Sequence, residues 1–392
     1  MSASTSCSAR AARLLATLRR GDGAPEAEAR SLGEECPAEF FGVVIEALAD
    51  SFQPVEAAAY ERLMREWIPE APQISPVLPA RVETVYVLSR VTLGSDIKIT
   101  SGILNALKNR FPESRIVLVG GRKTAELFAA DARIEHMEAN YPRTGPVSAR
   151  LEFAHHLRGR LEGPNRIVVD PDSRMTQLGL IPACEPEHYF HFPSRTADAD
   201  STDDLSRIAR RWFRQQFGES NTAQWSYIAP QPVDIASSKP WAAVSLGVGG
   251  NDTKRVNGDF EARLIRALAE RYATVWVDRG AGGEEARRVT AAVDASGLAD
   301  RVRYWEGSFA GFASVISQSD LYVGYDSAGQ HAAAASGVQQ ITVFAGAPSR
   351  RFEQRWAPYG AGKQVMIRAD GDEPETVYAA LLGCLPPALN FS

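Results

Sequence analysis

The chain has 392 residues, which is long for one hydrophobic core and predicts two or more domains. Hydrophobic residues make up 44% and charged residues 23%, and the net charge is −5; this composition is typical of a globular protein and excludes a basic nucleic-acid-binding surface. The longest apolar runs have the length of a strand, so we predict no helix of the roughly 20 residues that cross a bilayer.

The cysteine spacing and the N-terminus indicate the cellular compartment that we expect for the protein. Cys7, Cys36, Cys184 and Cys384 are isolated in the sequence, with no CxxC pair and no other metal-like spacing. The N-terminus has no basic segment followed by an apolar one, so we identify no signal peptide. We therefore expect free thiols in a reducing cytoplasm and no zinc site.

Residues 1–80 are predicted to form a helical region. Apolar residues recur at spacings of three and four over 11–18, 40–48 and 55–64, and glycines and prolines separate these segments. We favour a helical cap on the next domain, because amphipathic helices usually bury their apolar face in their own chain. The alternative is a module that docks an acceptor or a second copy of the chain.

From residue 81 onward, strand and helix patterns alternate in two sets joined by a polar bridge over 194–240. Such alternation predicts parallel strands with crossover helices. We expect an α/β fold with two Rossmann-like domains, 81–235 and 236–392, that face each other across a cleft. The predicted strands are 85–88, 116–119, 166–170, 241–246, 274–277, 302–304, 321–323 and 341–344. The predicted helices are 97–110, 124–130, 203–217, 260–271, 284–295, 331–335 and 375–382.

The stretch from 321 to 346 organises the second set. A strand at 321–323 leads into a polar turn with Asp326, Ser327 and Gly329, and a small-residue helix begins near His331. The N-terminus of a helix presents unpaired N–H groups and a partial positive charge, which suits a phosphate. Polar residues in such a turn can also serve only as helix caps.

Two further loops follow the opening strands of the two sets. In the second set, Gly249 and Gly250 permit close backbone approach, and Lys254 and Arg255 add two cations beside them. This pattern predicts an anion site, although exposed turns often contain the same residues. In the first set, the loop from 89 to 96 ends with Ser95 and Asp96.

Taken in order, these three loops resemble the ADP-heptose:lipopolysaccharide heptosyltransferase family, glycosyltransferase family nine, which has the two-Rossmann GT-B fold. The matching residues are Asp96, Ala106-Leu107-Lys108, Phe111-Pro112, Gly249-Gly250, Lys254, Asp326-Ser327-Ala328-Gly329, His331 and Ala332-Ala333-Ala334. The chain departs from the family pattern at Ser95, Gly102, Val256-Asn257 and Ala328. The resemblance spans about 85–350 and points to a divergent member.

The resemblance implies a role for Asp96, which occupies the place of the family's general base. Such a carboxylate removes the proton of the acceptor while the nucleotide leaves the other face of the sugar, with inversion. Asp96 could instead cap the helix that follows it.

The resemblance also implies a donor site in the second set, where Lys254 and the helix beginning near Gly329 neutralise the departing diphosphate, so that no metal or other cofactor is needed. Asp326 and Ser327 would hold the sugar or the phosphates. His331 would touch the diphosphate or serve as a structural histidine. The full set of expected donor-binding residues is Gly249, Gly250, Thr253, Lys254, Arg255, Asp326, Ser327, Ala328, Gly329 and His331.

A competing pattern is Asp170-Pro-Asp172-Ser-Arg174, which follows the strand at 166–170. An Asp-x-Asp pair holds Mg²⁺ or Mn²⁺ in the other large glycosyltransferase fold, GT-A. In a GT-B protein the same loop would face the acceptor, so Ser95, Asp170, Asp172 and Arg174 are candidates for acceptor contacts.

The sequence thus favours an inverting, metal-independent glycosyltransferase that uses a nucleotide sugar, above all ADP-heptose. The acceptor would be a saccharide, a protein or a small metabolite, and we favour a soluble one because no basic amphipathic helix is visible. A non-catalytic sugar-nucleotide-binding or assembly protein is the rival hypothesis. A homo-oligomer formed through the N-terminal helices is a further possibility.

Overall fold

The computed structural model describes residues 3–21, 25–70, 74–220, 222, 224–235, 239–249, 251–280, 282–369, 371 and 373–388. The chain divides into two compact units. The first comprises Met1–Thr92, Ala106–Arg122 and Arg133–Asn221, and the second comprises Leu93–Asn105, Lys123–Ala132 and Thr222–Ser392. The predicted domain boundaries after residues 80 and 235 stay predictions, and each unit is described by itself.

The first unit contains a five-stranded parallel sheet of order β3-β2-β1-β4-β5. Its strands are β1 (Thr84–Leu88), β2 (Arg115–Gly120), β3 (Ile134–Glu138), β4 (Arg166–Asp170) and β5 (Tyr189–His191). The helices α9 (Val147–Leu161) and α10 (Leu205–Phe217) belong to the same unit. Asp204 caps α10 by accepting hydrogen bonds from the backbone of Ser206 and Arg207.

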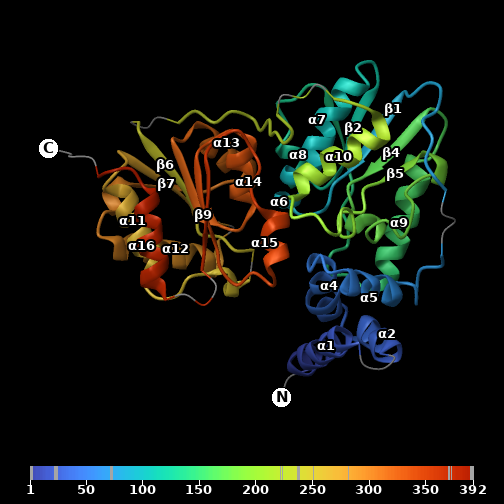
Figure 1. Ribbon diagram of the computed structural model, residues 1–392, viewed down its shortest axis with the longest axis horizontal. Helices are drawn as coiled ribbons and strands as arrows, with labels where there is room; N and C mark the ends of the chain where they lie inside the picture. The colour runs from blue at the N-terminus through green and yellow to red at the C-terminus, as the bar shows by residue number, and fades with distance from the viewer. Residues whose placement is uncertain are drawn as a thin grey trace. The chain divides into compact units, whose positions relative to one another are not determined.

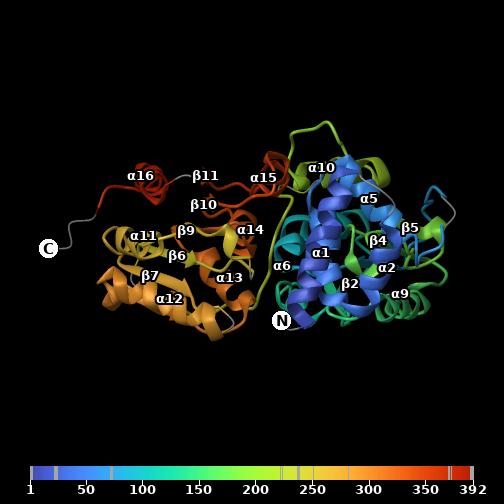
Figure 2. The ribbon, with the colours of Figure 1, turned by 90° about the horizontal axis from the view of Figure 1, so that it is seen from below.

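The N-terminal region is helical, as predicted, and its helices lie together against one end of this sheet (Figures 1 and 2). They are α1 (Ala3–Arg20), α2 (Glu26–Glu35), α3 (Pro37–Glu39), a π-helical segment (Phe40–Ile45), α4 (Glu46–Asp50) and α5 (Pro54–Met64). Their apolar faces share one buried cluster with Val147 and Ala154 of α9 and with the segment 178–181. This packing confirms the interpretation as a cap.

Polar contacts fasten the helices to the loop that follows β4. Arg174 forms ion pairs with Glu46 and, at 3.4 Å, with Asp50, both on α4. The hydroxyl of Tyr60 on α5 donates a hydrogen bond to the carbonyl of Gln177 at 2.8 Å. The loop after β4 is therefore held in place by the added helices as well as by its own sheet.

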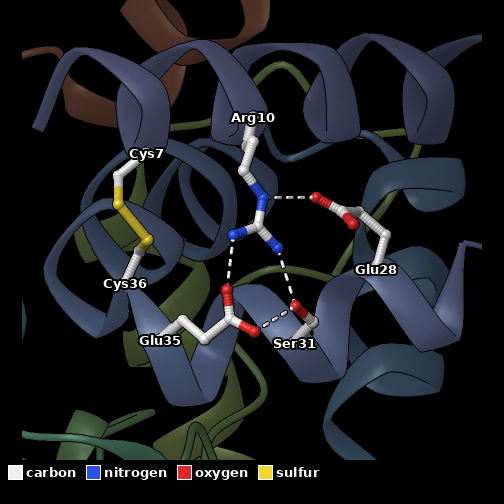
Figure 3. The surroundings of a disulfide bond; sticks show 6 residues. All are labelled: Cys7, Arg10, Glu28, Ser31, Glu35 and Cys36. Carbon is white, nitrogen blue, oxygen red and sulfur yellow. Dashed lines mark hydrogen bonds and ion pairs between the residues drawn. A yellow bond between two sulfur atoms is a disulfide. The ribbon is translucent and has the colours of Figure 1, made fainter. Parts of the chain in front are cut away.

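The prediction of four free thiols is wrong for two cysteines, because Cys7 and Cys36 form a disulfide with a Cα–Cα distance of 5.9 Å (Figure 3). Antiparallel packing of α1 and α2 brings the start of one helix to the end of the other, which a separation of 29 residues in sequence conceals. Arg10 lies beside the disulfide and bridges the two helices through hydrogen bonds to Glu28, Glu35 and Ser31. The other two cysteines are free, and Cys184 is buried.

The second unit contains a six-stranded parallel sheet of order β11-β10-β9-β6-β7-β8. Its strands are β6 (Trp241–Ser245), β7 (Thr274–Asp278), β8 (Val302–Trp305), β9 (Leu321–Tyr325), β10 (Gln340–Phe344) and β11 (Gln364–Arg368). The helices of this sheet are α11 (Phe260–Ala269), α12 (Gly283–Ser296), α13 (Phe309–Gln318), α14 (Ala328–Ala335), α15 (Arg350–Trp356) and α16 (Pro374–Cys384).

A helical stretch that follows β1 in sequence begins in the second unit. It consists of α6 (Leu93–Ser95), a π-helical segment (Asp96–Thr100) and α7 (Ser101–Arg110), of which the part up to Asn105 belongs to that unit. The helix α8 (Arg122–Glu126) follows β2 and is shorter than the predicted segment 124–130.

Both sheets are doubly wound, so the fold prediction of two Rossmann-like sheets is confirmed. In each sheet, the chain adds strands outward from a central strand in one direction and then adds strands outward in the opposite direction. The strand order therefore reverses between β1 and β4 in the first sheet and between β6 and β9 in the second. Ligands of doubly wound sheets bind at the carboxyl ends of the strands at such a reversal point. Within the described part of the chain, no helix is both long and apolar enough to cross a membrane.

Candidate functional site

The reversal point of the second sheet joins the two predicted donor loops. Lys254 ends a 3₁₀ turn in the loop after β6, and Asp326 follows β9 directly. The ammonium of Lys254 lies 2.6 Å from Oδ2 of Asp326, and Gln330 donates to Oδ1 of the same carboxylate at 2.6 Å. Lys254 and Asp326 are 72 residues apart in sequence, but they lie together because their loops follow the neighbouring strands β6 and β9.

The turn after β9 places the N-terminus of α14 at the same point. Ser327 is the N-cap residue, but its side chain makes no cap hydrogen bond. Gly329 has no room for a side chain, since a Cβ there would lie 2.1 Å from the hydroxyl of Tyr322. A small residue lets the start of α14 sit directly on the sheet, so the free N–H groups of its first turn lie close to Lys254.

His331 lies one turn into α14 and is buried. Its pKa is held well below the usual value, first by burial of the ring and then by the charges of Lys98 and Lys254. His331 is therefore neutral at pH 7. Lys98, which is only 2% exposed, donates to the carbonyl of Ala357 at 2.6 Å.

We call Lys98, Lys254, Asp326, Ser327 and His331 the α14 cluster. Lys254 pairs with the carboxylate of Asp326, and Lys98 and Lys254 lie near the neutral imidazole of His331 at the start of α14. Such a set is suited to a diphosphate. A diphosphate carries more negative charge than the Asp326 carboxylate, which forms an ion pair with Lys254 in this structure.

The remaining donor-side candidates shape the loop rather than the cluster. Arg255 forms ion pairs with Asp252 at 2.8 Å and Glu261 at 3.3 Å and donates to the carbonyl of Leu246, so its charge is already engaged. The hydroxyl of Thr253 donates to Asn251. Ala328 is the first residue of α14, Gly249 has a left-handed φ of 64°, and Gly250 lies outside the described residues.

Asp96 lies in the second unit and is completely buried. Thr100 donates to its Oδ1 at 2.9 Å and Thr124 donates to its Oδ2 at 3.0 Å. It is not a helix cap, because the helical turn of α6 precedes it. Ser95 is buried beside it, and the role of Asp96 as a base stays a prediction.

The Asp-x-Asp pair lies at the reversal point of the first sheet, but its two carboxylates have separate partners. Asp170 accepts hydrogen bonds from the backbone of Ser173 at 2.6 Å, from Thr176 at 2.5 Å and from Tyr189. Arg174 pairs with the N-terminal helices instead. Among the described residues, no group of three or more His, Cys, Asp or Glu side chains could hold a metal ion, and the pair offers no support for the GT-A interpretation.

Asp172 orients its neighbours instead of facing solvent. It accepts from Ser194 at 2.6 Å and lies 3.2 Å from Nε2 of His191, with the guanidinium groups of Arg195 and Arg90 at 3.5 and 3.9 Å. Burial alone would raise the pKa of Asp172, but Arg195, His191 and Arg90 outweigh burial and lower it. The carboxylate is therefore ionised.

Sequence reasoning missed three polar residues at these two reversal points: Lys98, His191 and Arg195. Lys98 lies within an apolar helical pattern and reads as a surface lysine. His191 ends the short strand β5 and Arg195 lies four residues later, and polar residues at the end of a strand of a doubly wound sheet were the signal that could have identified them.

Two doubly wound parallel sheets are the architecture of the GT-B glycosyltransferase fold. Residues 206–385 match the model of glycosyltransferase family 9 (heptosyltransferase). This segment is less than half of the chain, and its match agrees with the resemblance found in the sequence.

Solved structures are similar in fold. A glycosyl transferase family 9 protein from Veillonella parvula has a TM-score of 0.56 at 16% identity, with 77% of this chain and 97% of that chain covered. The E. coli heptosyltransferase WaaC with ADP-2-deoxy-2-fluoro heptose gives 0.56 at 18%, covering 76% and 98%. The E. coli ADP-heptose lps heptosyltransferase II gives 0.53 at 16%, also covering 76% and 98%. No curated protein matches the chain.

Proposed function

We propose that the protein is an inverting glycosyltransferase that moves heptose from ADP-heptose to a hydroxyl or amine of an acceptor. The observation that carries the proposal is the α14 cluster, because it gathers two lysines and a helix N-terminus at the reversal point where a doubly wound sheet binds its ligand. The heptose and the ADP are inferred from the family match of residues 206–385 and from the similar E. coli heptosyltransferases.

In the proposed reaction, the acceptor oxygen or nitrogen forms a bond to the anomeric carbon as the bond from that carbon to the diphosphate breaks. The electron pair of the broken bond goes to the leaving ADP. Lys254 and the N–H groups at the start of α14 stabilise the negative charge that develops there. For this, Lys254 exchanges its contact with Asp326 for a contact with the diphosphate.

Asp96 would take the proton that the acceptor loses. A carboxylate suits this role because it is an anion at neutral pH and can accept a proton as the new bond forms. Its two threonine partners, Thr100 and Thr124, would hold its oxygens in a fixed orientation. No metal ion takes part in this scheme, so EDTA should leave the rate unchanged, and recovery of a lost rate by Mn²⁺ would contradict it.

The isosteric variant Asp96→Asn tests the assignment of the base. We expect it to bind ADP like the wild type, measured by calorimetry, and to lose turnover of ADP-heptose. Asp252→Asn is the matched control, because Asp252 lies in an exposed loop. Normal turnover by Asp96→Asn would remove Asp96 from the mechanism.

A second candidate function is a non-catalytic sugar-nucleotide-binding or assembly protein. The complete burial of Asp96 and the engagement of both its oxygens favour it, because a base must reach the acceptor. This alternative predicts ADP-heptose binding without transfer and without slow hydrolysis of the donor. Incubation of the full chain with ADP-heptose and detection of released ADP separates the two functions.

The acceptor and the setting are part of the same proposal. We expect a soluble saccharide, protein or small metabolite as acceptor, and we keep the cytoplasmic location predicted from the sequence. A reducing compartment would oppose the Cys7–Cys36 disulfide, so the state of these two cysteines in cells tests the location. Alkylation of thiols before cell lysis, followed by mass spectrometry, measures it. Association of copies through the N-terminal helices would appear in sedimentation as a mass above 42.6 kDa.

A further inference from the structure

The first unit contains a cavity of about 720 Å³ that no motif in the sequence indicated. One wall is α5, which contributes Ala57 and Ala58. The opposite wall consists of the loop after β4 and the segment after β5, with Leu180 and Pro193 among its apolar residues. The volume lies within the range of small-molecule sites, roughly 300–1,000 Å³. Because α5 belongs to the added helical region, the cavity exists only in a chain that has this region.

His191 presents a hydrogen-bond acceptor to this cavity. Asp172 is ionised and can only accept, so the proton between the two residues lies on Nε2 of His191. In this tautomer the lone pair of the imidazole lies on Nδ1. Within the described part of the chain, no group makes a hydrogen bond to that atom, and His191 lines the cavity.

Arg195 lies at the same Asp172 carboxylate as His191. Its guanidinium stacks on the ring of Tyr60 at 4.4 Å, and its Nη2 donates to the carbonyl of Leu178 at 3.1 Å. Its Nη1 is buried and, among the described residues, has no hydrogen-bond partner. The guanidinium is therefore enclosed by the protein, and Nη1 does not open to the cavity.

The backbone of the loop after β4 makes room for the imidazole. Gly179 has a φ of 84°, and a Cβ at this position would lie 2.3 Å from Cε1 of His191. Gln177 and Leu178 before it also have left-handed φ values, of 52° and 57°. Consecutive residues in this region are unfavourable and are typical of ligand sites, where the surroundings hold them in place.

The charge around the cavity argues against a strongly anionic ligand. At its rim, Glu61 and Arg65 neutralise each other in an ion pair of 3.1 Å. Deeper in, the charge of Arg195 faces the carboxylate of Asp172. What remains is the lone pair of His191, the polar residues Ser75, Thr196 and Gln216, and apolar residues such as Leu180 and Pro193. A sugar matches this set, because its hydroxyls both donate and accept and its C–H faces pack on apolar side chains.

We propose that this cavity is a saccharide-binding site in which Nδ1 of His191 accepts a hydrogen bond from a sugar hydroxyl, while Arg195 holds the Asp172 carboxylate that orients the imidazole. Asp172 is a positioning residue that fixes the tautomer of His191. That this saccharide is the acceptor rests on the proposed function. That the cavity binds a saccharide does not.

The first test observes the imidazole directly in the full-length protein. Long-range ¹H–¹⁵N spectra should show His191 in the Nε2–H tautomer, and titration with glucose, mannose and maltose should shift its Nδ1 resonance. Inorganic phosphate should not shift it. A Nδ1–H tautomer, no shift with any of the three sugars, or a shift with phosphate alone would overturn the proposal.

The second test compares three substitutions. His191→Phe keeps a ring to stack on Tyr189 but removes the lone pair, and it should weaken sugar binding about tenfold. His191→Asn restores an amide oxygen near the position of Nδ1 and should recover part of the affinity. His155→Phe, on an exposed histidine of α9, is the control and should change nothing. Equal affinity for His191→Phe and the wild type would refute the assignment.

The two proposals fail in different ways. A wild-type protein that binds sugar in the cavity but never releases ADP from ADP-heptose refutes the glycosyltransferase and leaves the saccharide site intact. In an active enzyme, His191→Phe should raise the KM for the acceptor about tenfold with kcat nearly unchanged. An active enzyme whose acceptor KM is the same in His191→Phe refutes the saccharide site alone.

Discussion

The Cys7–Cys36 disulfide should contribute substantially to the stability of the first unit. It closes a loop with a sequence separation of 29 residues, for which loop-closure entropy gives about 3.6 kcal/mol. Other contacts keep α1 in place without it, since Arg10 bridges α1 to α2 and Ala11, Leu14 and Leu18 are buried. We therefore expect the double variant Cys7→Ala/Cys36→Ala to fold, with a free energy of unfolding lower by up to about 3.6 kcal/mol.

Urea titration of the wild type with and without reductant, followed by fluorescence, measures this difference. Reduction should lower the midpoint of the wild type and leave the midpoint of the double variant unchanged. Cys384→Ser, which keeps the disulfide and removes a free thiol, is the matched control. A count of reactive thiols under denaturing, non-reducing conditions should give two per chain.

Two results would refute this reasoning. Equal midpoints for oxidised and reduced wild type would mean that the cross-link contributes nothing beyond the packing of α1. Four reactive thiols in protein purified without reductant would mean that the sequence-based expectation of free cysteines is right for the isolated protein.

The remaining predictions concern the α14 cluster and the N-terminal helices. Lys254→Ala removes a charge-assisted contact worth about 1.5–3 kcal/mol and should weaken ADP binding about 10- to 100-fold in calorimetry. Lys239→Ala, at an exposed lysine, is the control and should leave ADP binding unchanged. If Lys254→Ala binds ADP as tightly as the wild type, the diphosphate does not bind at Lys254. The pKa of His331 is lowered in the folded state, so below about pH 6.5 the imidazole takes up a proton only in the unfolded chain. The free energy of unfolding should therefore fall on acidification by at most about 1.4 kcal/mol per pH unit. His331→Gln should remove that part of the slope in urea titrations at pH 7 to 5, and an identical slope would contradict a neutral His331. Arg174→Met leaves Glu46 without its main cation and should lower the urea midpoint by the equivalent of about 2 kcal/mol, and an unchanged midpoint would show that the ion pairs are dispensable.

The sequence was most informative where a strand is buried on both faces. The predicted strands at 85–88, 116–119 and 321–323 coincide with β1, β2 and β9, because strands of a covered parallel sheet are continuous apolar runs. The strand β3 was missed because it is exposed at three of its five residues and contains two glutamates. The strand β5 was missed because it has only three residues. The sequence patterns of β3 and β5 are therefore no different from that of a loop.

The site could be predicted only as far as single loops allow. Lys254 and Asp326 were named because each sits beside glycines after a strand, and a doubly wound sheet brings the two loops together. Lys98 could not be named, since its contact with Ala357 joins segments 259 residues apart. The Asp-x-Asp pair misled for the same reason. Its form is that of a metal site, but Thr176, Tyr189 and Ser194 supply donors to these carboxylates only in the folded chain.

The added helices affect the ligand-facing edge of the first sheet and not only its surface. Tyr60 of α5 both supports the guanidinium of Arg195 and donates to the backbone of Gln177, which precedes Gly179 in the strained loop. Arg174 binds α4 at the other end of the same loop. Because residues 178–181 also share the apolar cluster of these helices, the conformation that gives His191 its place depends on the N-terminal region. The region that falls outside the resemblance is therefore the one that completes the cavity of the first unit.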